Sequence, residues 1–169
     1  MGKRAVFAQA LMLWGAGPAL AADPCLPGTL RIWESRGVLE LRLDGEISIG
    51  TAGVIAGAFF DRNKRVKAVT LSLNSCGGAV DYMELVVHIL EQIKATHPLT
   101  TKVERGDRCS SACVPVFLVG TRRVGALSSV WYFHPVTQYP KPPAKPVSVP
   151  AATEDVIHRY FLQAGVSPD

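Results

Sequence analysis

Strand-like and helix-like segments alternate along most of this chain. Apolar residues recur at every second position over 39–43 and again over 69–73, which predicts two half-buried strands. Helical spacing follows each of them, over 51–60 with Thr51 as the cap and over 83–93 before His97-Pro98 ends the helix. This alternation predicts an α/β fold with mainly parallel strands.

The same alternation continues into the second half. We expect strands over 99–103 and 129–133 and helices over 112–119 and 155–164. Asp44-Gly45 and Gly77-Gly78 are each expected to form a turn after a strand. The segment 139–150 contains five prolines, which predicts an irregular or extended surface segment.

The first 21 residues have the composition of an export signal. Lys3 and Arg4 precede a mainly apolar stretch, and Ala19-Leu20-Ala21 is a small-x-small cleavage site. The apolar stretch is shorter than the ~20 residues of a membrane-spanning helix. We therefore expect a signal peptide over 1–21 and one domain over 22–169, exported to the periplasm or secreted, with no stable membrane anchor.

The net charge excludes an obvious nucleic-acid partner. The formal charge is +4, and Lys3 and Arg4 supply two of these charges, which are lost with the signal. The small remainder gives no strong attraction to a phosphate backbone, so we expect no nucleic-acid binding.

All four cysteines remain in the exported product: Cys25, Cys76, Cys109 and Cys113. An oxidising compartment permits disulfides, and four cysteines allow three pairings that spacing cannot distinguish. A Cys109–Cys113 bridge would brace the turn that carries Ser111, and Cys25–Cys76 would then tie the N-terminal segment to the glycine turn. Zinc binding by Cys109, Cys113 and His134 is the alternative, but a paired C-x-x-C signature is missing, so no metal is expected.

The pentad Cys109-Ser110-Ser111-Ala112-Cys113 stands where a helix begins, and His134 follows the next strand pattern. A serine hydroxyl becomes a good nucleophile when a neutral imidazole takes its proton. Backbone amides of Ala112 and of Gly77 or Gly78 would bind the oxyanion. The pattern therefore predicts one serine-hydrolase site, although capping by the serines and tight turns at the glycines are alternatives.

Three motifs together resemble the Clp protease proteolytic subunit and crotonase superfamily, and most closely its exported Clp-protease-like branch. They are Leu73-Asn74-Ser75-Cys76-Gly77-Gly78, the cysteine-flanked pentad, and Trp131-Tyr132-Phe133-His134-Pro135. The resemblance implies a spiral of strand-strand-helix units, with Ser111 as nucleophile, His134 as base, and Gly77, Gly78 and Ala112 in the oxyanion hole. It implies no cofactor, a peptide or ester substrate, and possible homo-oligomers.

The resemblance leaves the third catalytic residue unassigned. Family members supply an acid after the helix that here ends near Ala164, and this sequence stops at Asp169, which predicts truncation at the C-terminus. Asp155 and Asp169 are the nearest candidates by order, and Cys76 stands where the protease subunit usually has proline. The alternatives to a hydrolase are a catalytically silent scaffold or assembly module, and crotonase-type acyl-CoA chemistry, which export disfavours.

Overall fold

The computed structural model describes residues 25–134, 136–138, 147–148 and 151–167. The expected signal 1–21, Asp169 and most of the proline-rich segment lie outside these residues. In chain order the elements are β1 (Thr29–Ser35), β2 (Val38–Ile47), α1 (Thr51–Phe60), β3 (Ala68–Gly78), α2 (Val80–Lys94), β4 (Leu99–Val103), β5 (Arg108–Ser110), α3 (Cys113–Leu118), β6 (Arg122–Gly125), β7 (Val130–Tyr132), β8 (Thr137–Gln138), β9 (Val147–Ser148) and α4 (Ala151–Gln163).

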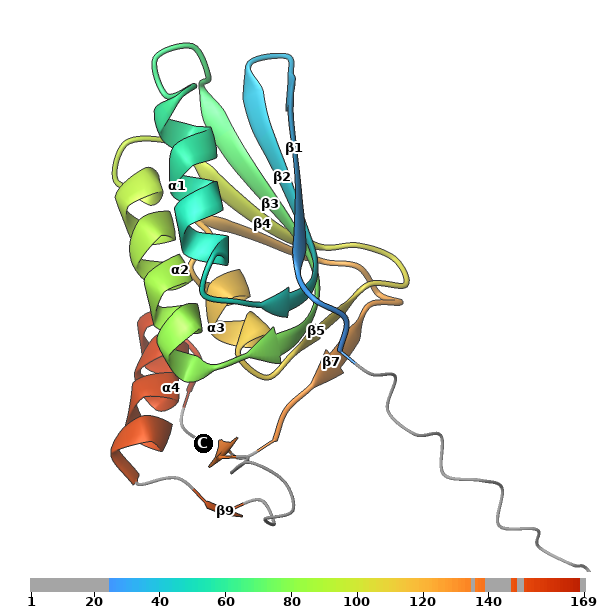
Figure 1. Cartoon of the computed structure of the whole chain (residues 1–169), viewed down its shortest axis with the longest axis vertical. Coiled ribbons are helices and arrows are strands. Elements are labelled where there is room, and N and C mark those ends of the chain that lie inside the picture. The colour runs from blue at the N-terminus through green and yellow to red at the C-terminus, as the bar shows by residue number, and fades with distance from the viewer. Residues whose placement is uncertain (1–24, 135, 139–146, 149–150, 168–169) are drawn as a thin grey trace, which may run out of the picture.

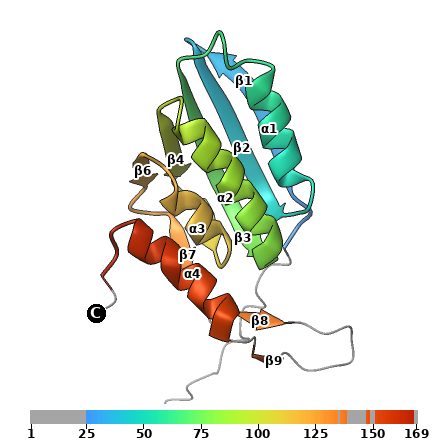
Figure 2. The same ribbon diagram turned by 90° about the vertical axis from the view of Figure 1, so that its left-hand side faces the viewer.

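One seven-stranded sheet organises these elements. Its main path is β1-β2-β3-β4-β6, and β5 and β7 extend from the far end of β3. Within this sheet β1 pairs antiparallel with β2, and the other strand pairs are parallel. Figure 1 shows α1 and α2 side by side along the sheet, and in Figure 2 both lie in front of the strands. The α/β fold with mainly parallel strands is therefore confirmed.

The core lies between the strands and these helices because the apolar periods match. The β2–β3 register sets Leu41 beside Leu71 and Leu43 beside Leu73, so their side chains lie on one face of the sheet. The facing stripe of α2 is buried as well: Met83, Val86, Val87, Leu90 and Ile93. Burial of these apolar surfaces is the main stabilising contribution to the fold.

Most expected elements are confirmed, and α1 and β4 have the expected bounds. The two predicted turns, at Asp44-Gly45 and at Gly77-Gly78, were wrong, because Asp44-Gly45 lies inside β2 and Gly77-Gly78 continues β3. Gly45 has a φ of 95° at a register shift in the β2–β3 pairing, which makes it a bulge and not a turn. The amide of the next residue, Glu46, has a partner that is distant in sequence, since it donates to the Leu26 carbonyl at 3.0 Å.

Among the helices of the described residues, none has both the length and the apolar character that crossing a membrane requires.

Candidate active site

Ser111 occupies a tight turn between β5 and α3. Its φ is 54°, a left-handed conformation that non-glycine residues rarely adopt. Backbone hydrogen bonds hold it there: the Ser111 amide donates to the Tyr132 carbonyl at 3.0 Å, and the Ser111 carbonyl accepts from the Val114 amide at 2.9 Å. Strain of this kind persists only where the surroundings enforce it, and it is concentrated at functional sites.

Two disulfides border the site. Cys109 is bonded to Cys113 on either side of Ser111, and Cys25 is bonded to Cys76 next to Gly77. Of the three possible pairings, the structure therefore contains the one in which Cys109–Cys113 braces the serine turn. Because Cys109 and Cys113 are bonded to each other, their sulfurs are not thiolate ligands for zinc.

The end of β3 packs directly against the serine turn. A β-carbon at Gly77 would lie 2.8 Å from Ser111 Cβ and 3.1 Å from the Ala112 nitrogen. The φ of Gly77 is +100°, so both its conformation and its surroundings require glycine. The glycine motif and the serine motif, more than 30 residues apart in the sequence, therefore form one site.

The backbone amides at this junction differ in their hydrogen bonding. The Gly77 amide donates to Ser75 Oγ at 3.1 Å, and Ser75 is fully buried. Among the described residues the Ala112 amide has no acceptor. Gly78 lies against the Ile47 backbone, whose carbonyl a β-carbon would overlap. The Ala112 amide thus has no competing acceptor within the described residues, whereas a substrate oxygen would compete with Ser75 for the Gly77 amide.

Strand pairing brings the segment that carries His134 to the serine turn. Ser110 is in register with Tyr132 across β5 and β7, and His134 follows two residues later. His134 is exposed, and its ring centroid lies 5.7 Å from that of Tyr132. In the described part of the chain the Ser111 hydroxyl makes no hydrogen bond, so the Ser111–His134 contact stays a prediction. Such contacts are often long in unliganded enzymes and tighten with substrate.

The acidic partner also stays unassigned. Asp155 is exposed on α4, and Asp169 lies outside the described residues.

A polar cluster that no sequence motif announced lies beside this site. Asp44 accepts hydrogen bonds from Asn74 Nδ2 at 3.1 Å and from Arg42 Nε at 3.2 Å. Arg42 also donates two hydrogen bonds of 2.7 Å to the Asp107 carboxylate, just before β5. The available signal was the alternation of polar residues in β2, because Arg42 and Asp44 share a face.

This cluster predicts a loss of stability in acid. Burial tends to raise the pKa of Asp44, but hydrogen bonds from Asn74, Arg42 and Arg31 outweigh burial and lower the pKa below its usual value. The stabilising contribution is present above the unfolded-state pKa of about 4 and is lost as the pH falls through the lower folded-state pKa. Urea unfolding should show that wild type exceeds Asp44→Asn in stability near neutral pH and that this difference shrinks below about pH 4. A difference that is independent of pH would contradict this assignment.

Replacing Gly77 by alanine is expected to damage both the site and the fold. The new β-carbon would meet backbone atoms at 2.8–3.1 Å, so the serine turn must move, and a shift of about 1 Å can cost ~10²-fold in rate. The positive φ adds strain of about 1–3 kcal/mol, measurable by urea unfolding. Gly53→Ala on α1 is the matched control, because a β-carbon there meets nothing within 4 Å. Equal behaviour of the two variants would refute the close packing at Gly77.

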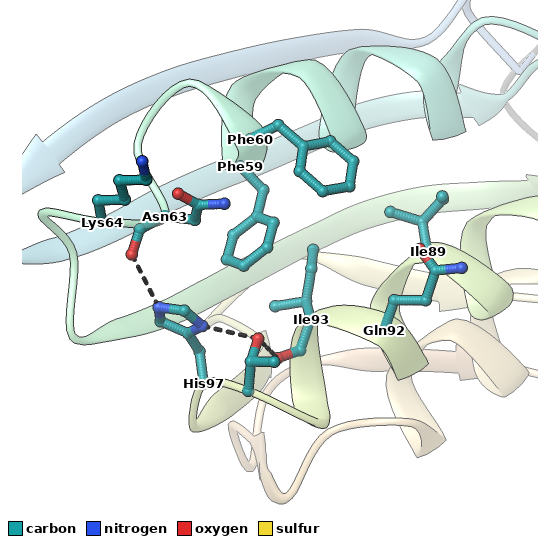
Figure 3. Close-up of a pocket in the computed structure, with 9 residues that line it drawn as sticks. Phe59, Phe60, Asn63, Lys64, Ile89, Gln92, Ile93 and His97 are labelled. Carbon is teal, nitrogen blue, oxygen red and sulfur yellow. Dashed lines mark hydrogen bonds between the residues drawn. The ribbon is translucent and has the colours of Figure 1, made fainter.

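A separate cavity of about 370 Å³ lies between the C-terminal ends of α1 and α2, and Phe59, Phe60, Ile89 and Ile93 supply its apolar lining (Figure 3). The ring nitrogens of His97 lie 3.1 Å from the Asn63 carbonyl oxygen and 2.9 Å from Thr96 Oγ1. None of the predicted site residues lines this cavity. It is therefore distinct from the Ser111 site.

Comparisons with known proteins show which solved structures have a similar fold. No family model and no curated protein matches the sequence. A mutant of the 1510-N membrane-bound stomatin-specific protease, in complex with a substrate peptide, is similar with a TM-score of 0.59 at 20% identity, over 75% of this chain and 57% of that chain. A ClpP1 mutant from Listeria monocytogenes is similar with a TM-score of 0.60 at 15% identity, over 76% and 73% of the two chains.

An enoyl-CoA hydratase from Mycobacterium avium subsp. paratuberculosis K-10 is also similar, with a TM-score of 0.51 at 16% identity, over 60% of this chain and 46% of that chain. The chain has the ClpP/crotonase fold. It spans less than two thirds of the length of the stomatin-specific protease and of the hydratase. At these identities the likeness concerns the fold, and the fold hosts both peptidases and acyl-CoA enzymes, so the chemistry has to be argued from the Ser111 site.

Proposed function

We propose that this chain is an exported serine hydrolase of the Clp-protease-like kind that cleaves peptide or ester bonds through an acyl-enzyme on Ser111. The observation that carries the proposal is the contact between Gly77 and the strained turn of Ser111. This contact brings together a serine, the Ala112 backbone and a glycine backbone, which supply a hydroxyl and two amides. Those are the parts that acyl transfer needs beside a base.

In the proposed reaction Ser111 Oγ attacks the substrate carbonyl carbon while His134 takes the hydroxyl proton. The carbonyl oxygen becomes an oxyanion, which the Ala112 amide and an amide of the Gly77-Gly78 segment stabilise by hydrogen bonds. His134 then gives its proton to the leaving amine or alcohol. Water, deprotonated by His134, releases the acid and restores Ser111.

Several features support a peptide as the substrate and export as the location. The 1510-N protease is described with a substrate peptide, which favours a peptide as the substrate of this chain. The basic start, apolar stretch and small-x-small site over 1–21 favour a cleaved signal. Two disulfides in so small a domain are typical of oxidising compartments. The proposed reaction uses no cofactor. We also propose that copies of this chain assemble into homo-oligomers.

A fluorophosphonate probe tests the proposal. The folded mature protein is incubated with the probe, digested and mapped by mass spectrometry, and heat-denatured protein serves as the control. We expect one phosphonyl group, on Ser111, in the folded sample alone. A folded protein that does not react at Ser111 would refute the hydrolase and favour a silent scaffold, which the engaged Gly77 amide would then explain.

A further inference from the structure

The strand that carries the serine turn has little ladder support on its β3 side. β5 is three residues long, and it pairs with β3 at one position, Ser75 with Cys109. Yet the turn that follows lies so close to Gly77 that a β-carbon there would be 2.8 Å from Ser111 Cβ. On the other side β5 pairs with β7 at three positions, so a contact from β3 to the start of β5 would add support where the ladder is weakest.

Asn74 supplies that support with both ends of its side-chain amide. Its Oδ1 accepts a hydrogen bond from the Arg108 amide at 3.2 Å, at the first residue of β5. Its Nδ2 donates to Asp44 Oδ1 on β2 at 3.1 Å. The two partners fix the orientation of the amide, because a backbone N–H needs an acceptor and a carboxylate needs a donor.

Arg42 closes this arrangement into a ring. It donates to Asp44 through Nε and to both oxygens of Asp107, the residue before Arg108. The side chains of Arg42 and Asp107 are only 16% and 10% exposed, so solvent screens this pair less than an open surface pair. The ring joins β2, β3 and the entry to β5 through charge-assisted hydrogen bonds, which are the stronger kind.

We propose that Asn74, held by Asp44, is a positioning residue that sets where β5 begins and thereby holds Ser111 against Gly77. This inference rests on the proposed hydrolase, because it names the residue that orients its nucleophile. Asn74 acts through the Arg108 backbone and touches no reacting atom. Misplacement of the turn by about 1 Å is enough to lower the rate ~10²-fold.

The decisive experiment exchanges the two partners. In Asn74→Asp two carboxylates face each other and the donor to Asp44 is lost, so the labelling rate of Ser111 should fall about 10- to 100-fold. With a p-nitrophenyl ester, kcat should fall while KM changes little. Adding Asp44→Asn to that variant restores one amide and one carboxylate, and the double variant should recover wild-type labelling to within about threefold.

Two further measurements separate positioning from general loss of stability. Hydrogen exchange at the Arg108 amide should be faster in Asn74→Asp and normal in the double variant. Glu34→Gln is the matched control, because it removes a 2.9 Å ion pair between Glu34 on β1 of the same sheet and Arg65 in the turn after α1. Its labelling and its Arg108 exchange should match wild type.

The possible failures are distinguishable. If wild type is not labelled, the hydrolase is refuted, and Arg108 exchange still tests the Asn74 contact. If wild type is labelled and Asn74→Asp is labelled at the same rate, the positioning role is refuted. If Asn74→Asp does not fold, the double variant decides: recovery of labelling supports the role, and a folded double variant with slow labelling overturns it.

Discussion

Replacing Ser111 by alanine is expected to reduce hydrolysis of a p-nitrophenyl ester to the background rate, a loss of up to about 10⁶-fold, and to abolish fluorophosphonate labelling. Without the hydroxyl no atom attacks the carbonyl carbon, so no acyl-enzyme forms and the amides have no oxyanion to stabilise. Measurement of kcat/KM and of the labelled mass checks both results.

Ser110→Ala is the control for this variant. Ser110 is the neighbouring hydroxyl, but it is buried at the end of β5, and the proposed mechanism gives it no role. We expect its labelling rate to stay within about threefold of wild type, since a small buried substitution changes little beyond local packing. Activity that survives in Ser111→Ala would contradict the serine mechanism and favour chemistry by paired amides alone.

The second large effect is expected from His134→Gln. The variant keeps a polar side chain but cannot take up the proton of Ser111, and a general base typically contributes ~10²–10⁴-fold. Labelling of Ser111 should slow by about that factor while the folded structure persists, because His134 is exposed. Second-order labelling rates and thermal unfolding provide the two readouts.

His158→Gln is the matched histidine control, since His158 is exposed on α4 and has no part in the mechanism. It should label at the wild-type rate. If His134→Gln and His158→Gln both label like wild type, His134 is not the base, and another group must deprotonate Ser111.

The elements that the sequence predicted best are those whose side chains define a face. Thr51–Phe60 and Leu99–Val103 were predicted to the residue, although the N-cap of α1 is Gly50 and not the expected Thr51, which is the first helical residue. The buried stripe of α2 follows helical spacing that no other structure satisfies. The cysteine pairing was open in the sequence, and the fold selected it by bringing Cys76 and Cys25 within 5.8 Å between their α-carbons.

The features that the sequence missed depend on distant partners. The strands β5 and β6 are short, and β6 is exposed throughout, so neither has a periodic signal. Gly45 was taken as a turn because local composition does not reveal the Leu26 carbonyl that pairs across the bulge. The Asn74 contacts to Asp44 and Arg108 depend on register, which only the assembled sheet sets.

The candidate site likewise has features that the sequence predicted and features that it could not predict. The serine and glycine motifs were recognisable as motifs, and their contact at Gly77 is confirmed. The engagement of the Gly77 amide by Ser75 was not predictable, because it depends on a side-chain torsion inside a buried strand. The predicted contact of His134 with Ser111 depends on a rotamer that sequence patterns do not encode.

The most direct measurement is a crystal structure of the mature protein after reaction with the fluorophosphonate. We predict a phosphonyl group on Ser111 Oγ, with its oxygen accepting a hydrogen bond from the Ala112 amide and a His134 ring nitrogen within hydrogen-bond reach of the adduct. An adduct whose oxygen points away from Ala112 and Gly77, with His134 beyond even a water-bridged distance, would contradict the proposed site.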